Sequence, residues 1–197
     1  RLAGCRYELI SDAVCRHLSD TRTPQGVTAL VKKQETPLEE ILARDENPCL
    51  FLLENLQDPG NMGTILRTSE GAGVSGIIMN RESVDPYNPK VIRSTMGAIF
   101  RMPFVIVDDF EDVLCRLKEA GVRTFAAHLD GEDFYRQDYR GGCAFFIGNE
   151  GNGLSEELAA RADGRIRIPM KGQVESLNAA VAATVLMYET LRQREWV

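Results

Sequence analysis

Three short polar segments carry the residues whose types and spacing could do chemistry. LLENLQDPGNMGTILRTSEGAG places Asn61 six residues before Arg67, and FFIGNEGNGLSEEL sets Glu150 among three glycines. RIRIPMKGQVESLNAAVAATVLMYE brings Ser176 and Asn178 to the start of a helix pattern rich in small residues. Glycine backbone lets a ligand contact peptide amides, and a guanidinium can bind phosphate or stabilise an oxyanion. We therefore expect a ligand site made of bare backbone, one carboxylate and one arginine.

Each segment also has a purely structural interpretation. Asn61 can begin a helix, Ser176 and Asn178 can cap another, and Ser155 with two following glutamates resembles an N-cap with an acidic first turn. Capping does not explain the run 148–151, since a generic turn has little need of so many special positions. At this loop the sequence favours a site over a turn.

Other kinds of site are poorly supported. The glycines of 71–76 spell G-x-G-x-x-G, but they follow a helix pattern and precede a strand, which is the reverse of a dinucleotide-binding turn. Five scattered cysteines without C-x-x-C spacing indicate neither a disulfide framework nor a zinc site, and predict reduced thiols in the cytosol. With only His17 and His128 available, we expect no metal.

The composition is that of an ordinary globular protein of 197 residues, with 44% hydrophobic and 26% charged residues. A net charge of -6 argues against a protein that coats nucleic acid by bulk charge, although a local basic patch stays open. No apolar run approaches the roughly 18 residues that a membrane span requires. We expect no membrane partner and a cytoplasmic location.

Apolar runs alternate with helix patterns along most of the chain, which predicts an α/β fold with a mainly parallel sheet. The expected strands are 49–54, 76–80, 103–107, 123–128, 143–148 and 165–169. The expected helices lie near 61–72, 88–98, 109–120, 155–162 and 178–193.

The first part of the chain differs in pattern. We expect an amphipathic helix over 6–20, a turn and strand over 23–33, and a short helix within 36–48. A boundary near 46–48 separates domains 1–47 and 48–197. Because the chain begins at Arg1 without methionine, we expect it to lack part of its natural N-terminus.

Taken together, the three segments resemble the motifs of the SpoU/TrmH-type RNA ribose 2′-O-methyltransferases of the SPOUT superfamily. The resemblance covers about 49–193 in order. The matching stretches are Asn61 with Arg67, Gly148-Asn149-Glu150-Gly151 with Gly153-Leu154, Ile168-Pro169-Met170 with Ser176-Leu177-Asn178, and the Ser-x-x-Gly-Ala segment within VIRSTMGAIFRMP.

This resemblance implies a C-terminal trefoil knot, a feature that periodicity could not have predicted. It also implies that S-adenosylmethionine lies in the knot against backbone groups of the second and third motifs. The cofactor contacts carried over are Gly148, Ile168, Met170 and Leu177. A ligand against the loop amides would then explain why the loop is rich in glycine.

The same resemblance implies catalytic roles for Asn61, Arg67, Glu150, Ser176 and Asn178. Family proposals make the arginine a general base, whereas a guanidinium stays protonated with a pKa above about 12. We therefore expect Arg67 to bind the target phosphate and stabilise the developing oxyanion, oriented by Asn61 and Glu150. Catalysis would then depend chiefly on positioning, and the acceptor of the hydroxyl proton is left open.

The expected partners are RNA and a second copy of the chain. Residues 1–47 resemble, more weakly, the tail of a ribosomal-protein-like RNA-binding domain, which favours ribosomal over transfer RNA. Family members are homodimers, and Tyr188 and Trp196 could contribute to such an interface. Candidate phosphate contacts, for which solvated surface charge is an equal alternative, are Arg93, Arg101, Lys171, Lys32 and Lys33.

Three functions are weighed. An S-adenosylmethionine-dependent RNA ribose methyltransferase leads, with ribosomal RNA preferred to transfer RNA. A binding module that keeps the fold and holds ribosomal RNA without turnover comes second. Five intact residues count against it, namely Asn61, Arg67, Glu150, Ser176 and Asn178. A nucleotide-dependent oxidoreductase comes third, because its glycine motif is inverted.

Overall fold

A computed structural model of the chain describes residues 6–19, 21, 23–34 and 36–195. The chain divides into two compact units, Arg1–Gln34 and Glu35–Val197. The sequence placed a boundary near 46–48, whereas the structure joins the residues after 35 to the second unit. The physical reason is helix α2 (Leu38–Leu42), because Leu38 and Ile41 are buried in a core that this unit shares.

In the first unit the described residues contain one helix, α1 (Asp12–Leu18), which Ser11 caps by accepting a hydrogen bond from the Val14 N–H (3.3 Å). It is shorter than the helix expected over 6–20. The strand expected within 23–33 is wrong for the described residues, which form no ladder there. A strand needs a neighbouring strand for its peptide groups, and no described segment pairs with this one.

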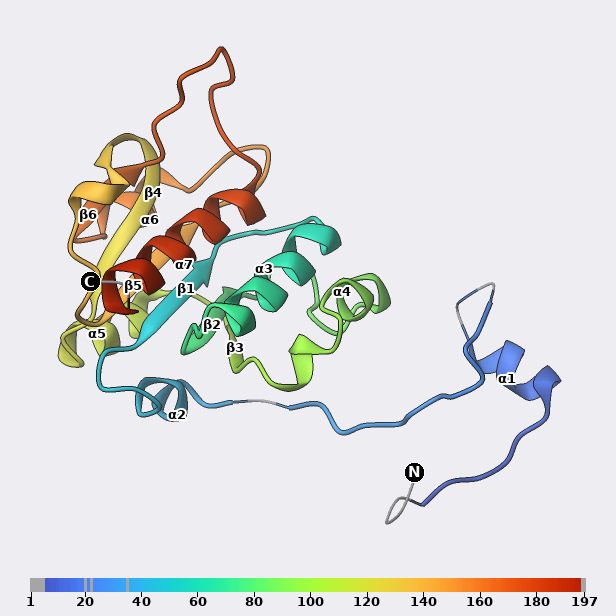
Figure 1. Cartoon of the computed structure of the whole chain (residues 1–197). Helices are drawn as coiled ribbons and strands as arrows, with labels where there is room; N and C mark the ends of the chain where they lie inside the picture. The colour runs from blue at the N-terminus through green and yellow to red at the C-terminus, as the bar shows by residue number, and fades with distance from the viewer. Residues whose placement is uncertain (1–5, 20, 22, 35, 196–197) are drawn as a thin grey trace. The chain divides into compact units, whose positions relative to one another are not determined.

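Within residues 36–195 lies a six-stranded sheet with the order β3-β2-β1-β5-β4-β6, and every pairing in it is parallel (Figure 1). The strands are β1 (Cys49–Leu53), β2 (Gly76–Asn80), β3 (Phe104–Val107), β4 (Arg123–Asp133), β5 (Cys143–Ile147) and β6 (Gly164–Arg167). The predicted α/β class with a mainly parallel sheet is confirmed.

Helices cover both faces of this sheet, which explains why its central strands are continuously apolar. One core contains residues of α3, α4 and α7, and the other contains residues of α2, α5 and α6. Phe51 of β1 faces the first core and Leu52 the second. The helices are α3 (Pro59–Gly71), α4 (Pro89–Ser94), α5 (Glu111–Glu119), α6 (Glu156–Ala160) and α7 (Ala179–Glu195), with short 3-10 turns η1 (Ala98–Phe100) and η2 (Phe134–Arg136).

The single helix expected over 88–98 is wrong, because α4 ends at Ser94 and η1 follows separately. Met96 (φ 51°) and Gly97 (φ 87°) between them are left-handed, a conformation that a continuous α-helix cannot contain. Ser94 lies against α3, where a Cβ on Gly63 would sit 1.8 Å from its Oγ. This close approach requires glycine at position 63.

The G-x-G-x-x-G sequence forms a helix end and a turn, as predicted. Helix α3 ends at Gly71, Gly73 is left-handed (φ 69°), and β2 begins at Gly76. A Cβ on Gly76 would meet the Ile41 side chain at 2.3 Å. These glycines therefore serve the turn and the packing of α2.

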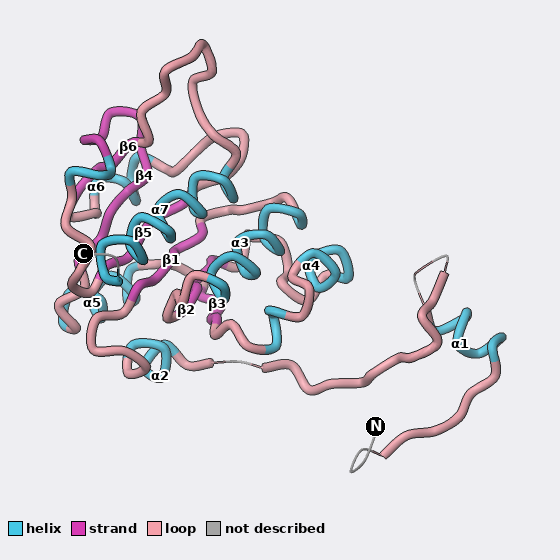
Figure 2. The backbone as a smooth tube through the Cα atoms, in the orientation of Figure 1, coloured by secondary structure: helices cyan, strands magenta, loops and turns pink. Residues whose placement is uncertain are grey.

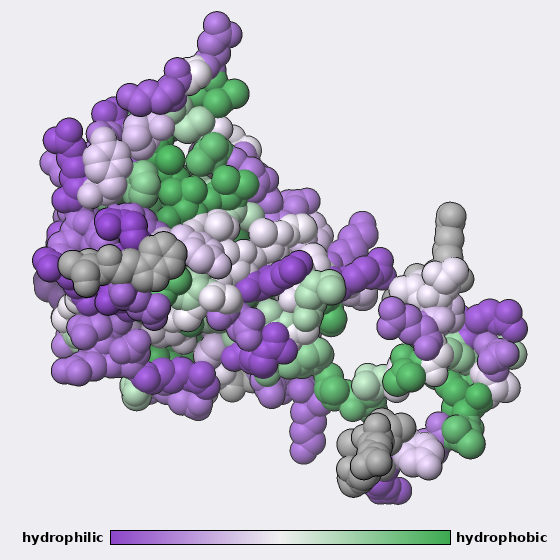
Figure 3. Space-filling model, viewed as in Figure 1, coloured by the Kyte–Doolittle hydropathy of each residue, from purple (hydrophilic) through white to green (hydrophobic). Residues whose placement is uncertain are grey.

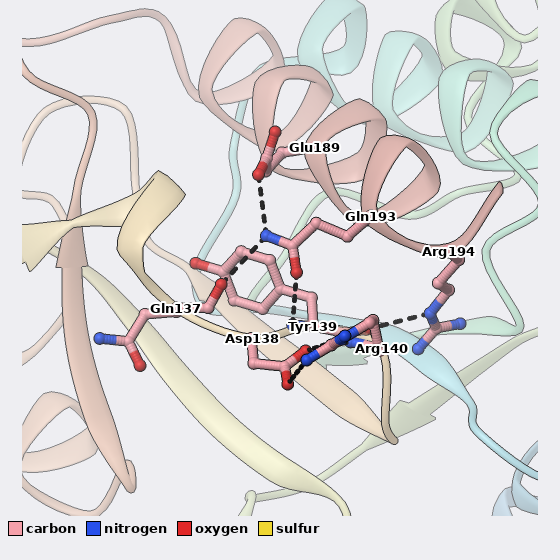
Figure 4. A network of polar contacts seen from close by, with 7 residues as sticks. All are labelled: Gln137, Asp138, Tyr139, Arg140, Glu189, Gln193 and Arg194. Atoms are coloured by element: carbon pink, nitrogen blue, oxygen red, sulfur yellow. Dashed lines mark hydrogen bonds and ion pairs between the residues drawn. The ribbon is translucent and has the colours of Figure 1, made fainter. Parts of the chain in front are cut away.

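The C-terminal half of α7 is tied to the loop before β5 by the contacts drawn in Figure 4. The Gln193 side chain accepts a hydrogen bond from the Tyr139 N–H (2.8 Å) and donates to the Gln137 carbonyl (3.0 Å). Arg194 donates to the Tyr139 carbonyl (3.0 Å). Burial of the Tyr139 ring raises the pKa of its hydroxyl, which donates to the Phe134 carbonyl (2.7 Å). These contacts fix α7, and with it the third polar segment, relative to the sheet.

Candidate active site

A cavity of about 350 Å³ lies at the carboxyl ends of β5 and β6, beside residues 127–129 in the middle of β4. Parallel sheets collect ligands at this carboxyl edge. Figure 2 shows the loop from β6 to α7 extending well beyond the strands, and Figure 3 shows apolar surface between that loop and α7. The lining residues are 127–129, 147–154, 166–168, 170, 175–177, 179, 182 and 186.

Six of the nine predicted site residues line this cavity. The four expected cofactor contacts all do so, together with one expected catalytic carboxylate and one hydroxyl; they are Gly148, Ile168, Met170, Leu177, Glu150 and Ser176. Residues from two loops that are distant in sequence thus form the walls of one cavity. The other three predicted residues, Asn61, Arg67 and Asn178, lie outside its lining.

Two of those three join Glu150 in a hydrogen-bonded network. Asn61 Nδ2 donates to Glu150 Oε1 (3.0 Å), and Asn178 Nδ2 donates to Asn61 Oδ1 (2.9 Å). The Asn178 side chain also accepts from the Ala180 N–H (2.9 Å), which satisfies the first turn of α7. One residue from each polar segment therefore takes part in the network, which links α3, the glycine loop and α7.

Asn61 was expected to begin α3, and this is wrong, because the helix begins two residues earlier at Pro59. Asp58 is the N-cap and accepts from the Asn61 N–H (2.8 Å), with Pro59 in the first turn, where its fixed φ suits a helix. Since Asp58 does the capping, the Asn61 amide is left to bind Glu150 and Asn178.

The Glu150 carboxylate is held by three N–H donors. Besides Asn61, the backbone N–H groups of Gln57 (3.0 Å) and Asp58 (2.9 Å) donate to its two oxygens. Burial raises the pKa of Glu150, but these hydrogen bonds lower it by more, so the net pKa lies below its usual value. Glu150 is therefore a carboxylate at neutral pH.

The structure gives a reason for glycine at position 148 besides the predicted contact with a ligand. A Cβ at this position would lie 2.1 Å from the Leu154 backbone nitrogen and 2.3 Å from the Gly153 carbonyl oxygen. The loop folds back on itself there, with Asn149 and Gly153 paired as an isolated bridge. Self-packing of the loop thus excludes a side chain at 148, and the left-handed φ of 71° favours glycine at 153.

Arg67 lies apart from this network. Its side chain is exposed on α3 and makes no hydrogen bond or ion pair with the residues that the structure describes. Asn61 and Glu150 contact each other instead, so their expected orienting contact with Arg67 is not formed. Asn61 and Arg67 are six positions apart on the helix, so their side chains point in different directions.

The candidate phosphate contacts differ in their freedom to bind RNA. Arg101 donates to Glu70 (2.7 Å) and to the Gly97 carbonyl (3.2 Å), so its charge is already paired. The side chains of Arg93 and Lys171, by contrast, have no hydrogen-bond or ion-pair partner among the described residues. The N-terminal lysines belong to the first unit.

Sequence reasoning missed further contacts that hold the glycine loop. Glu54 accepts from the Ser155 N–H (2.7 Å) and Oγ (2.6 Å), and the Ser155 side chain in turn caps α6, as predicted. Asn149 Nδ2 donates to the Asn55 carbonyl (2.8 Å). Glu54 and Asn55 directly follow the apolar run of β1, and polar residues at that position are the signal that could have indicated them.

No group of three metal-ligating side chains is present in the described part of the chain. Likewise, no described helix is both long and apolar enough to cross a lipid bilayer.

The chain as a whole is similar to known proteins. A model of the SpoU rRNA Methylase family matches residues 48–188. The 23S rRNA (guanosine(2553)-2′-O)-methyltransferase RlmP of Bacillus subtilis is 32% identical over 186 residues, which are 94% of this chain and 72% of that protein. The 23S rRNA (guanosine-2′-O-)-methyltransferase RlmB of Vibrio cholerae is 35% identical over 177 residues, covering 86% and 71%.

Solved structures agree in fold. The AdoMet-bound rRNA methyltransferase from Sinorhizobium meliloti superposes with a TM-score of 0.84 and 34% identity, covering 92% of this chain and 70% of that one. The SpoU methyltransferase AviRb from Streptomyces viridochromogenes, in complex with AdoMet, also gives a TM-score of 0.84, with 31% identity and coverage of 93% and 72%.

Proposed function

This chain belongs to the SpoU rRNA Methylase family, and we propose that it transfers a methyl group from S-adenosylmethionine to a ribose 2′-hydroxyl of ribosomal RNA. The observation that carries this function is the cavity at the carboxyl ends of β5 and β6, in a chain that matches named 2′-O-methyltransferases over most of its length. Transfer RNA is the alternative substrate, and a fold that binds ribosomal RNA without turnover is the alternative role.

The cavity suits S-adenosylmethionine in size and in chemistry. Its volume of about 350 Å³ falls within the range of roughly 300–1,000 Å³ typical of small-molecule sites. Ile168, Met170 and Leu177 offer apolar walls for an adenosine, and the loop beginning at Gly148 offers peptide groups with few side chains between them. When bound, the cofactor supplies a methyl group activated by a sulfonium. We assign these four residues to its binding.

The chain's own residues would position the RNA for reaction. We assign Arg67 to the target phosphate and the developing oxyanion, because it is a guanidinium that no described residue neutralises. Asn61, Glu150 and Asn178 hold α3, the glycine loop and α7 together, and so set the distance between cofactor and RNA. Ser176 lines the cavity. Arg93 and Lys171 are further phosphate contacts.

A homodimer would bring Arg67 of one subunit toward the cofactor of another. Supporting this proposal, the α7 side chains Val181 and Tyr188 are exposed, and they lie seven residues apart on one helix face. The expected contribution of Trp196 lies outside the described residues. Sedimentation analysis of the wild type and of Tyr188→Glu tests this proposal. We expect a dimer for the wild type and a monomer for the variant.

Three finer proposals accompany this function. We infer a trefoil knot in the chain from β4 to α7. In support of this, the chain leaves the edge strand β6 and returns past β5, so that α7 packs against α3. A crystal structure with an unthreaded path would contradict it. We also assign the N-terminal segment, predicted as residues 1–47 but without helix α2, to the end of an RNA-binding domain, and the protein to the cytoplasm.

The deciding experiment measures tritium transfer from labelled S-adenosylmethionine to RNA. Purified 23S ribosomal RNA and bulk transfer RNA are offered separately, and the products are mapped for 2′-O-methylation. We expect label in ribosomal RNA and none in an oligonucleotide whose target carries a 2′-deoxyribose. Label in transfer RNA alone would favour the alternative substrate, and cofactor binding without label in either would favour the non-catalytic role.

A further inference from the structure

Three asparagines join the end of β2 to the glycine loop across the end of β1. Asn80 Nδ2 donates to Asn55 Oδ1 (2.6 Å), and the Asn55 N–H donates to Asn80 Oδ1 (2.9 Å). On its other side, Asn55 accepts at its carbonyl from Asn149 Nδ2 (2.8 Å). Asn149 Oδ1 then accepts from the N–H groups of Gly151 (2.8 Å) and Asn152 (3.1 Å). An unbroken series of hydrogen bonds thus runs from the sheet to the cavity wall.

The series begins at a rigid point. Asn80 is only 8% exposed and ends β2, a strand with parallel partners on both sides. Its Oδ1 also accepts from Ser83 Oγ (2.8 Å), so its amide orientation is set on two sides. Because a buried amide loses free energy when it is left without partners, Asn80 holds Asn55 strongly in place.

The middle residue has an uncommon backbone conformation. Asn55 is left-handed (φ 54°), a state that asparagine tolerates better than most residues but that still costs free energy. The paired hydrogen bonds with Asn80 offset that cost. The left-handed turn directs the Asn55 carbonyl to Asn149, so the conformation of Asn55 and the position of the loop depend on each other.

The end of the series shapes the part of the loop that lines the cavity. Gly151 and Asn152 are exposed, and the backbone bridge from Asn149 to Gly153 is internal to the loop. Both polar atoms of the Asn149 side chain are used, one on Asn55 and one on the loop amides. Asn149 is therefore occupied in fixing the loop rather than in binding a ligand directly.

We propose that Asn80, Asn55 and Asn149 are positioning residues that hold the glycine loop in the shape that binds S-adenosylmethionine. The inference rests on the proposed function and deepens it, because Asn80 and Asn55 lie outside the cavity lining and act only through Asn149.

A double-mutant cycle tests the proposal by calorimetric titration with S-adenosylmethionine. We expect Asn80→Ala and Asn149→Ala each to weaken binding by about tenfold, the size of effect typical of a lost hydrogen bond in a network. The double variant should be weakened by little more than about tenfold, since the second change disrupts a series that is already broken. Independent roles predict that the effects multiply to roughly a hundredfold, and that result would overturn the proposal.

A matched control separates positioning from general destabilisation. Thr124→Val removes a buried hydroxyl that donates to Asp163 (2.8 Å) and accepts from its N–H (3.0 Å), at the opposite end of the sheet. We expect it to lower Tm as Asn80→Ala does, with cofactor affinity unchanged. Equal loss of affinity in both variants would mean that Asn80 acts only through stability, and would overturn the proposal.

The outcomes also separate this inference from the proposed function. A wild-type chain that binds no S-adenosylmethionine refutes the proposed function. A wild-type chain that binds, with Asn80→Ala binding equally well, refutes only the positioning role. Should Asn80→Ala fail to fold, Asn55→Gly replaces it, because glycine keeps the left-handed backbone and the carbonyl acceptor and loses only the bond from Asn80. Undiminished affinity in that variant would likewise refute the role.

Discussion

Replacing Glu150 with glutamine removes one negative charge from the centre of the network that joins the polar segments. The carboxylate accepts from the backbone N–H groups of Gln57 and Asp58 and from Asn61 Nδ2. A glutamine side chain has one acceptor oxygen and one NH₂ group. With its oxygen toward Asp58 and Asn61, the variant leaves the Gln57 N–H facing another donor.

The expected loss in the free energy of unfolding follows from these three contacts. A hydrogen bond to a charged group contributes about 1.5–3 kcal/mol where water is excluded, and a neutral one roughly half of that. Glu150 is exposed at the surface, so solvent screening reduces the total, and we expect a loss of about 1.5 kcal/mol. For a chain of this size that corresponds to a fall in Tm of about 3–6 °C.

The assay is thermal unfolding of both proteins at neutral pH and in acid. Burial raises the pKa of Glu150 and its hydrogen bonds lower it by more, so the folded-state pKa lies below the ordinary 4.5. A depressed pKa stabilises the folded state above the unfolded value, and that stabilisation is lost as pH falls through the folded value. Since glutamine does not titrate, the Tm difference should be full at pH 7 and shrink below pH 4.5.

Two results would refute this reasoning. One is an unchanged Tm for Glu150→Gln at pH 7, and the other is a difference that grows as the solution is acidified. Glu82→Gln is the matched control, because its carboxylate makes no hydrogen bond or ion pair with any described residue. It should leave Tm unchanged.

Three further substitutions test other parts of the site. Arg67→Ala should lower methyl transfer by about a hundredfold and leave cofactor affinity intact, and near wild-type rates in both Arg67→Ala and Arg67→Lys would remove this residue from the chemistry. Gly148→Ala places a Cβ 2.1 Å from the Leu154 nitrogen, so calorimetry should show weaker cofactor binding, and the free energy of unfolding should fall by about 1–3 kcal/mol. An unchanged affinity and stability would contradict the self-packing of the loop. Gln193→Leu leaves the Tyr139 N–H without its acceptor, so denaturant unfolding should show a loss of about 1–3 kcal/mol, and wild-type stability would mean that this bond contributes little.

Much of the fold could be predicted because local rules and tertiary packing agree along most of the second unit. Continuously apolar runs formed strands, since helices cover both faces of a parallel sheet. Ser155 capped α6 as expected. The prediction over 88–98 was wrong where the rules conflict, because helix propensity does not reveal that the chain turns left-handed at Met96 and Gly97.

The sequence predicted which residues belong to the candidate site more fully than it predicted the contacts between them. The four expected cofactor contacts line one cavity, yet the glycine at 148 is explained first by the backbone of 153–154. Asn80 and Asn55 were missed because Asn80 ends β2 while Asn55 follows β1, and their pairing depends on which strands are neighbours. Local sequence patterns do not indicate pairs of residues that lie this far apart in the chain.

The amino-acid sequence by itself determined the alternation of strands and helices and the three polar segments, because these depend on residue type and local spacing. Only the tertiary structure decided that Asn61, Glu150 and Asn178 meet in one network while Arg67 points elsewhere. The physical reason is that hydrogen bonds act over about 3 Å, whereas strand order and helix packing bring together residues more than a hundred positions apart.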